Sequence, residues 1–87
     1  MYSVQYKKSV EKDLRKLASG IREPIVHKIQ ALATNPRPDG ATKIRGSDSI
    51  YRIRHADYRA VYRIHDSVLT VLIVKVGHRR EVYRELR

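Results

Sequence analysis

Four closely spaced arginines are the residues in this chain best suited to chemistry. The segment IYRIRHADYRAVYRI (residues 50–64) carries Arg52, Arg54, Arg59 and Arg63. Like charges that face each other across a strand pair destabilise a sheet, so a purely structural polar face would be better built from mixed charges. A guanidinium group is planar, stays charged and grips phosphate oxygens with two parallel hydrogen bonds. The pattern predicts a site for a multiply charged anion; the alternative is a solvated face whose arginines splay apart.

The length of the turn around Ala56-Asp57 decides whether these arginines share one face of the sheet. A two-residue or a four-residue loop places Arg54 opposite Arg59, whereas a three-residue loop would break this arrangement. Side chains alternate between the two faces of a strand, so with this register all four arginines lie together. The opposite face, which we assign to the helices, carries Tyr51, Ile53, Ala60, Tyr62 and Ile64.

A second basic segment, VGHRREVYREL, follows the most apolar stretch of the chain. We expect Gly77 at the end of a strand, with His78, Arg79 and Arg80 beside the arginine face. Histidine titrates near neutrality and can carry a proton, although His78 could equally do no more than end the strand. Tyr83 could stack on a nucleobase, or it could be a core residue of a last helical turn.

The overall composition favours a polyanionic partner in the cytoplasm. The net charge is +10, from 19 Lys and Arg against 9 Asp and Glu. Such a charge points to nucleic acid first, an acidic protein second and an anionic membrane third. The chain has no cysteine, and its longest apolar run, VLTVLIV, is too short to cross a bilayer. Four scattered histidines without carboxylates at ligand spacing predict no metal site, and we expect no cofactor and no membrane partner.

The first half of the chain predicts one strand and two helices. YSVQY (residues 2–6) alternates between apolar and polar residues, as a short strand does. Apolar residues then recur at helical spacing from about residue 7, and again after Ser19-Gly20, which we interpret as a stop signal between two helices. NPRPDG (residues 35–40) combines prolines with glycine and predicts a loop.

The second half predicts three consecutive strands, IYRIRH, YRAVYRIH and VLTVLIVKV, followed by one or two helical turns. The order β-α-α-β-β-β is typical of an α+β fold. We therefore expect an antiparallel meander with an N-terminal αα-hairpin packed on one face and a short C-terminal helix. Residues 1–87 would form a single domain.

Through YRIRHADYRAVYRI, VLTVLIVKV and VGHRREVYREL, the sequence resembles the RelE family of toxins, within the RelE/ParE superfamily of toxin–antitoxin systems. The likeness covers nearly the whole chain. It implies a RelE-like fold and a metal-independent endoribonuclease that enters the ribosomal A site and cuts the mRNA codon there. The ribose 2′-OH attacks the adjacent phosphate, which leaves a 2′,3′-cyclic phosphate and a 5′-OH. The resemblance also implies a heteromer with an acidic, RelB-like antitoxin that wraps and blocks the toxin.

The resemblance carries catalytic roles onto Arg52, Arg54, Arg59, Arg79 and Tyr83. Well-studied family members have lysines at the first two positions, and one of these lysines is often assigned as the general base. An arginine stays protonated and is a poor proton acceptor. Our hypothesis is that the first three arginines hold the scissile phosphate, that Arg79 or His78 donates a proton to the departing 5′ oxygen, and that Tyr83 orders the neighbouring base. As further RNA-binding residues we expect Arg63, His78 and Arg80.

Three other functions remain open at this point. The chain could be a ParE-like toxin that inhibits DNA gyrase without chemistry on the same fold. It could be a toxin weakened by the two arginines that replace lysines, or a basic nucleic-acid-binding module without chemistry. Binding to all of these partners would weaken as salt rises, so the chemical ends of a product discriminate where affinity does not.

Overall fold

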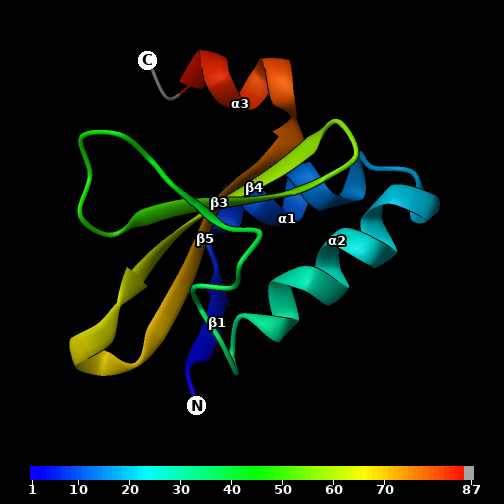
Figure 1. The fold of residues 1–87 in the computed structure, drawn as a ribbon. Helices are drawn as coiled ribbons and strands as arrows, with labels where there is room; N and C mark the ends of the chain where they lie inside the picture. The colour runs from blue at the N-terminus through cyan, green and yellow to red at the C-terminus, as the bar shows by residue number, and fades with distance from the viewer. Residues whose placement is uncertain (86–87) are drawn as a thin grey trace.

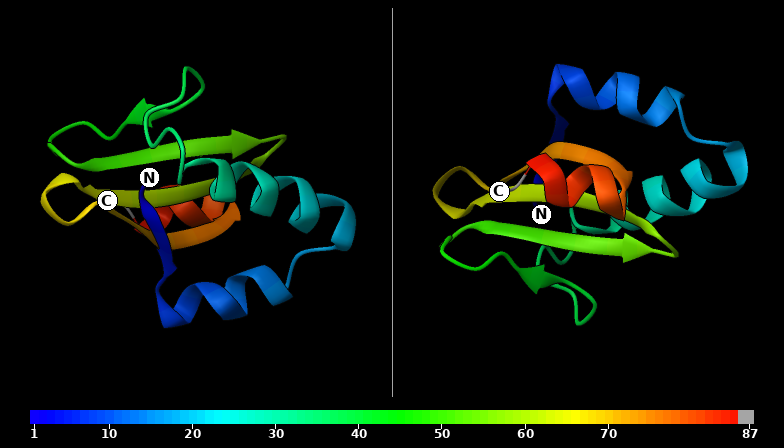
Figure 2. Two further views of the ribbon diagram at one scale, coloured as in Figure 1. Left: turned by 90° about the horizontal axis from the view of Figure 1, so that it is seen from below. Right: turned by 90° about the horizontal axis from the view of Figure 1, so that it is seen from above.

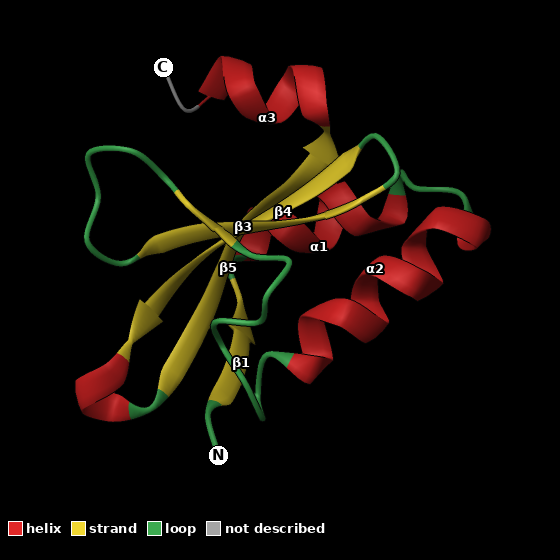
Figure 3. Cartoon of the chain, in the orientation of Figure 1, coloured by secondary structure: helices red, strands yellow, loops and turns green. Residues whose placement is uncertain are grey.

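The computed structural model describes residues 1–85, and the side chains of residues 1–82. In chain order its elements are β1 (Ser3–Tyr6), α1 (Lys8–Arg15), α2 (Ser19–Ala31), β2 (Thr42–Lys43), β3 (Ile50–His55), β4 (Tyr58–His65), the 3-10 turn η1 (Asp66–Val68), β5 (Thr70–His78) and α3 (Arg79–Glu85). The strands form one five-stranded sheet in the order β1-β5-β4-β3-β2 (Figure 1). The predicted α+β fold, with its N-terminal αα-hairpin and its short C-terminal helix, is confirmed (Figure 3).

The sheet is mixed rather than wholly antiparallel. Strands β3, β4 and β5 form the expected antiparallel meander. β1 pairs in parallel with β5, from Ser3 beside Thr70 to Tyr6 beside Ile73. A pattern of alternating residues shows that a strand exists but not which distant strand it joins, so this parallel edge was missed. β5 has a neighbour on each side, which accounts for its apolar sequence.

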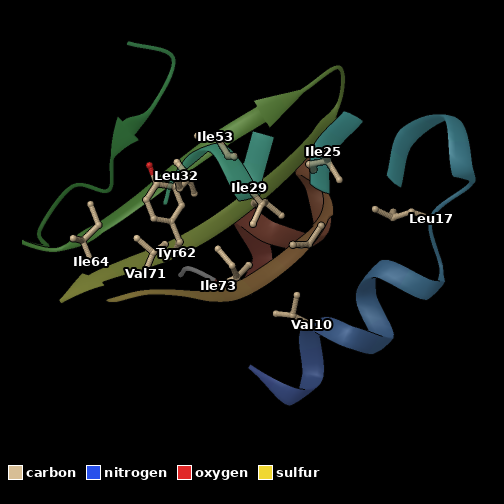
Figure 4. Packing of buried hydrophobic residues seen from close by; sticks show 12 residues of the cluster. Val10, Leu17, Ile25, Ile29, Leu32, Ile53, Tyr62, Ile64, Val71 and Ile73 are labelled. Carbon is tan, nitrogen blue, oxygen red and sulfur yellow. The ribbon is translucent and has the colours of Figure 1, made fainter. Parts of the chain in front are cut away.

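The αα-hairpin covers one face of the sheet and closes the main hydrophobic core. Ile25 and Ile29 of α2 and Leu32 at its C-terminal cap recur at helical spacing and are fully buried (Figure 4). They join Tyr62 and Ile73 of the sheet in one cluster. Burying side chains of this size stabilises a fold by about 1.5–3 kcal/mol each, which is the main force that holds α2 in place.

The boundary between the two helices differs from the prediction. α1 ends at Arg15, and Ser19-Gly20 begins α2 instead of ending α1. Ala18 precedes α2 in extended conformation, with φ −61° and ψ 148°. Serine is favoured near helix starts and glycine after helix ends, so the pair is an ambiguous signal from sequence alone.

The short helix α3 covers part of the other face of the sheet. It packs against β4 and β5, apart from the αα-hairpin (Figure 2). Val61 and Val82 are both fully buried, yet neither belongs to the main core cluster. Gly77 of β5 lies directly under α3: a Cβ at this position would be 3.0 Å from the Glu81 carboxylate and 3.9 Å from the Val82 side chain. Along the described chain, no helix has the length and apolar character needed to cross a membrane.

Candidate functional site

The β3–β4 hairpin has the register that the sequence predicts. Arg54 lies opposite Arg59, Arg52 lies opposite Val61, and the two strands are joined by the two-residue turn of Ala56 and Asp57. Side-chain alternation therefore places Arg52, Arg54 and Arg59 on the same face of the sheet. Ala56 adopts a φ of 53°. A residue with a Cβ in this left-handed conformation costs about 1–3 kcal/mol, so other contacts must hold the turn.

Three of the arginines converge on one pocket at the end of this hairpin. Arg52, Arg54 and Arg59 line a space of about 200 Å³, together with Gly40, Thr42 and Ile53. None of these lining residues is acidic, so the pocket concentrates positive charge. We call it the arginine pocket.

Arg63 lies apart from the arginine pocket. It is exposed and stands opposite Ile50, at the far end of the hairpin. Only three of the four arginines of this face are therefore brought together. A role for Arg63 would be limited to contact with a longer ligand that extends along the sheet.

Arg59 is also tied to the turn. Its side chain is only 7% exposed. Its Nη1 donates to the backbone oxygens of Ala56 at 3.1 Å and Tyr58 at 3.0 Å. These carbonyl oxygens offset part of the repulsion between Arg54 and Arg59. The sequence alone showed no group that could offset it. They also fix the direction of the Arg59 side chain before any ligand arrives.

His78 does not lie beside the arginine pocket, contrary to the prediction. β5 continues one residue beyond Gly77, which pairs with Arg59, so His78 pairs with Tyr58. Alternation then sends the His78 side chain to the opposite face. Its ring meets the Tyr58 ring edge-on, with 5.5 Å between centroids, and its Nδ1 accepts the backbone N–H of Arg80 at 3.3 Å. The sequence does not show where β5 ends. Because β5 extends through His78, its side chain follows the alternation of the strand and lies on the face opposite Arg59.

Arg79 is joined to the hairpin turn. Its backbone N–H donates to the backbone oxygen of Asp57 at 2.7 Å, and its Nε lies 4.0 Å from a carboxylate oxygen of Asp57. The side chain of Arg79 is half exposed, and Arg80 beside it is exposed as well. The side chain of Tyr83 lies outside the described residues, and its role stays a prediction. Within the described residues, no three histidine or carboxylate side chains gather as a metal ion would require.

A polar clasp holds the loop of residues 35–40, which supplies Gly40 to the arginine pocket. Arg37 donates to both carboxylate oxygens of Asp66, at 3.2 and 2.8 Å, and to the Tyr51 hydroxyl at 3.2 Å. The buried Tyr62 hydroxyl donates to the Pro36 backbone oxygen at 2.8 Å. Sequence reasoning missed this loop as part of the site, because its residues follow no period.

The electrostatics of the clasp are those of matched charges. The hydrogen bonds from Arg37 hold the pKa of Asp66 below its ordinary value, and the bond from Tyr2 acts in the same direction. Burial raises the pKa of Tyr62 to about 12. Both pKa shifts keep Asp66 ionised and Tyr62 protonated at neutral pH, so the hydrogen bonds of the clasp stay intact there.

Comparisons with known sequences place the whole chain in one group of proteins. Residues 4–83 match the family model described as the ParE toxin of the type II toxin–antitoxin system parDE. The mRNA interferase toxin RelE of Escherichia coli (strain K12) is 35% identical, over 97% of this chain and 92% of that protein. Toxin RelG of Mycobacterium tuberculosis is 32% identical, over 95% of this chain and 97% of that protein.

Solved structures agree with the sequence matches. The isolated E. coli RelE toxin superposes with a TM-score of 0.81 at 32% identity, over 99% of this chain and 95% of that chain. The intact E. coli RelBE toxin–antitoxin complex matches with a TM-score of 0.79 at 30% identity, over 90% of this chain and 96% of that chain. The family match, residues 4–83, includes both the arginine pocket and the start of α3.

Proposed function

Because the chain belongs to the ParE toxin family of type II toxin–antitoxin systems, within the RelE/ParE superfamily, we propose that it is a ribosome-dependent mRNA endoribonuclease that inhibits translation. The observation that carries this proposal is the arginine pocket, which suits a phosphate whose negative charge grows during reaction. The relative named mRNA interferase toxin RelE supports the same chemistry. In this proposal residues 1–87 act as one toxin domain in the cytoplasm.

The proposed reaction is attack by the ribose 2′-OH on the neighbouring phosphate in an A-site codon. The bond from phosphorus to the 5′ oxygen breaks, which leaves a 2′,3′-cyclic phosphate and a 5′-OH. Arg52, Arg54 and Arg59 hold the phosphate and its developing charge. Arg59 is the best preorganised of the three, because the turn backbone already fixes its guanidinium.

Arg79 is our candidate for the group that faces the departing 5′ oxygen. It starts α3 on the hairpin turn, where its side chain remains half exposed. His78 is left out of this step, because its ring lies against Tyr58 on the opposite face. Tyr83 would stack on a base, and Arg63 and Arg80 would contact phosphates along the RNA, which positions the strand without reading its sequence.

The proposed partner is an acidic, RelB-like antitoxin in a heteromer. The structural relatives include a RelBE toxin–antitoxin complex. The net charge of +10 attracts an acidic segment, which accelerates encounter and favours the correct partner.

The test is primer-extension mapping of a defined mRNA in a purified translation system, with and without ribosomes. We expect cuts within A-site codons, only in the presence of ribosomes, with 5′-OH ends. Intact mRNA under these conditions would contradict the proposal.

A second candidate is favoured by the description of the matching family model, which names the ParE toxin. That candidate is a gyrase inhibitor without chemistry. Intact mRNA together with blocked supercoiling of plasmid by DNA gyrase would support it. Intact mRNA with normal gyrase activity would instead indicate a catalytically weakened toxin.

A further inference from the structure

A second pocket adjoins the arginine pocket at the edge of the sheet. It has a volume of about 280 Å³ and is lined by Lys28, Ala31, Leu32, Asn35, Pro38, Gly40, Ile53 and Arg54. β2 pairs only with Tyr51 and Arg52, so the edge of β3 beyond Arg52 carries no further strand within the described chain. The end of α2 and the loop of residues 35–40 stand along this open edge (Figure 1). We call this space the edge pocket.

The two pockets lie side by side at the edge of β3 and differ in chemistry. Gly40, Ile53 and Arg54 line both of them. The arginine pocket gathers guanidinium groups, whereas the edge pocket has apolar walls from Ala31, Leu32 and Pro38. A nucleotide has the same two parts, an anionic phosphate and a flat base of low polarity, joined by one ribose.

Two polar groups of the edge pocket suit the edge of a base. The Asn35 side-chain oxygen accepts the backbone N–H of Arg37 at 3.1 Å, which leaves the amide nitrogen of this lining residue as a donor for a ligand. The Lys28 Nζ donates to the backbone oxygen of Arg54 at 3.1 Å, which places a positive charge between the two pockets. Few, well-placed polar groups on apolar walls are what gives a small-molecule site its specificity.

We propose that the edge pocket binds the nucleobase next to the phosphate in the arginine pocket, and so selects which codons are cut. This inference rests on the proposed function. An apolar side chain of a protein partner would also fit the apolar walls, but it would not use the three guanidinium groups of the adjoining arginine pocket. A nucleotide uses both pockets at once, and it is the occupant that the adjacency of the pockets favours.

The first measurement is binding of small probes to the full chain by NMR titration. The probes are the four nucleoside 3′-monophosphates and inorganic phosphate. Burying a base against apolar walls is favourable, so we expect at least one nucleotide to bind about tenfold more tightly than phosphate. Equal affinities for all nucleotides and for phosphate would overturn the inference.

A matched pair of variants locates the base. Ala31 is the last residue of α2, is exposed and lines the edge pocket, so Ala31→Phe fills the pocket without disturbing the core. Gln30 is its exposed neighbour and lines a different surface, which makes Gln30→Phe the control. We expect Ala31→Phe to remove the advantage of the nucleotide over phosphate and to leave phosphate binding unchanged. Gln30→Phe should keep the advantage.

The same pair is then tested in the ribosome assay across a set of codons. Ala31→Phe should reduce cutting of the preferred codons about tenfold and flatten the differences among codons, as expected when a pocket contact is lost. A codon profile identical to that of the original chain would overturn the inference. So would a variant that loses only affinity for the antitoxin, because the edge pocket would then belong to the protein partner.

The two proposals can fail separately. Probe binding needs neither ribosomes nor cleavage. A chain that prefers nucleotides over phosphate but leaves mRNA intact would contradict the proposed function alone. A chain that cuts mRNA but shows no such preference would contradict the base pocket alone.

Discussion

The two ends of the β3–β4 hairpin use arginine in opposite ways. At the end near η1, Arg37 meets both carboxylate oxygens of Asp66 and the hydroxyl of Tyr51, and its guanidinium lies 5.5 Å from the centre of that ring. At the turn end, three arginines line a pocket that has no acidic residue in its lining. A cation that is already matched stabilises structure. Cations gathered in the lining of one pocket raise the local positive potential and suit an anionic ligand.

The largest expected effect comes from Arg59, which belongs to the turn end. Arg59→Ala should lower the rate of mRNA cutting by a factor of about 10²–10³, as loss of one preorganised donor does in other enzymes. It should also lower the free energy of unfolding by about 1–3 kcal/mol, because the Ala56 and Tyr58 carbonyls lose their donor. Single-turnover cutting and urea denaturation measure the two losses.

Arg63→Ala is the matched control for this prediction. Arg63 lies on the same face of β4 but is exposed and outside the arginine pocket. We expect its removal to change cutting less than Arg59→Ala by at least about tenfold and to leave stability within about 0.5 kcal/mol. Cutting at the original rate by a folded Arg59→Ala protein would remove Arg59 from the site.

The next effect tests whether the pocket lacks a proton acceptor. The double variant Arg52→Lys, Arg54→Lys restores the residue type found in the RelE family and keeps the charge. Lysine loses its proton far more easily than arginine, and a general base contributes a factor of about 10²–10⁴. We expect cutting to rise by at least about tenfold in the ribosome assay.

Arg63→Lys serves as the control for the change of cation type. It introduces a lysine on the same face but away from the pocket and keeps the charge that contacts the RNA, so the cutting rate should change far less than in the double variant. A fall in cutting by the double variant would show that two-point contact of guanidinium with phosphate outweighs any gain of a base.

A smaller effect is expected at the other end of the hairpin. Tyr62→Phe removes the hydrogen bond from the buried hydroxyl to the Pro36 backbone oxygen. The free energy of unfolding should fall by about 1–3 kcal/mol, since the buried oxygen loses its partner. Thermal and urea unfolding measure this. Tyr51→Phe is a useful comparison, because its hydroxyl is less buried and accepts from the exposed Arg37; we expect it to cost less.

The smallest effect is a pH dependence of the clasp. The pKa of Asp66 is lower in the fold than its ordinary value of 3.8. A carboxylate with a depressed pKa contributes stability above its unfolded pKa and loses that stability as pH falls through its folded pKa. The chain should therefore lose stability below about pH 4. Asp66→Asn should be less stable than the original chain at neutral pH and should show a smaller fall on acidification, measured as Tm against pH.

The sequence was most informative where structure is local. A two-residue turn and the period of two were enough to place Arg52, Arg54 and Arg59 together, as the register confirms. The same reasoning failed for His78. The face of the sheet on which its side chain lies is fixed by its place in β5, and the sequence does not show that β5 extends as far as His78. Gly40 reaches the site from a loop without periodicity, which is held by the clasp around Arg37 and by the pairing of Thr42 with Arg52. The edge pocket was out of reach for the same reason, since distant segments build it.

The parallel pairing of β1 with β5 also bears on how the protein is made. β1 leaves the ribosome before every other strand of the sheet, and its partner β5 leaves after all of them. The sheet is complete only when β1 and β5, which are separated by a long stretch of chain, have come together. Bringing them together costs chain entropy before their contacts form. β4, which carries Arg59, also needs β5 as its neighbour. A nascent chain therefore holds no completed arginine pocket until β5 has left the ribosome.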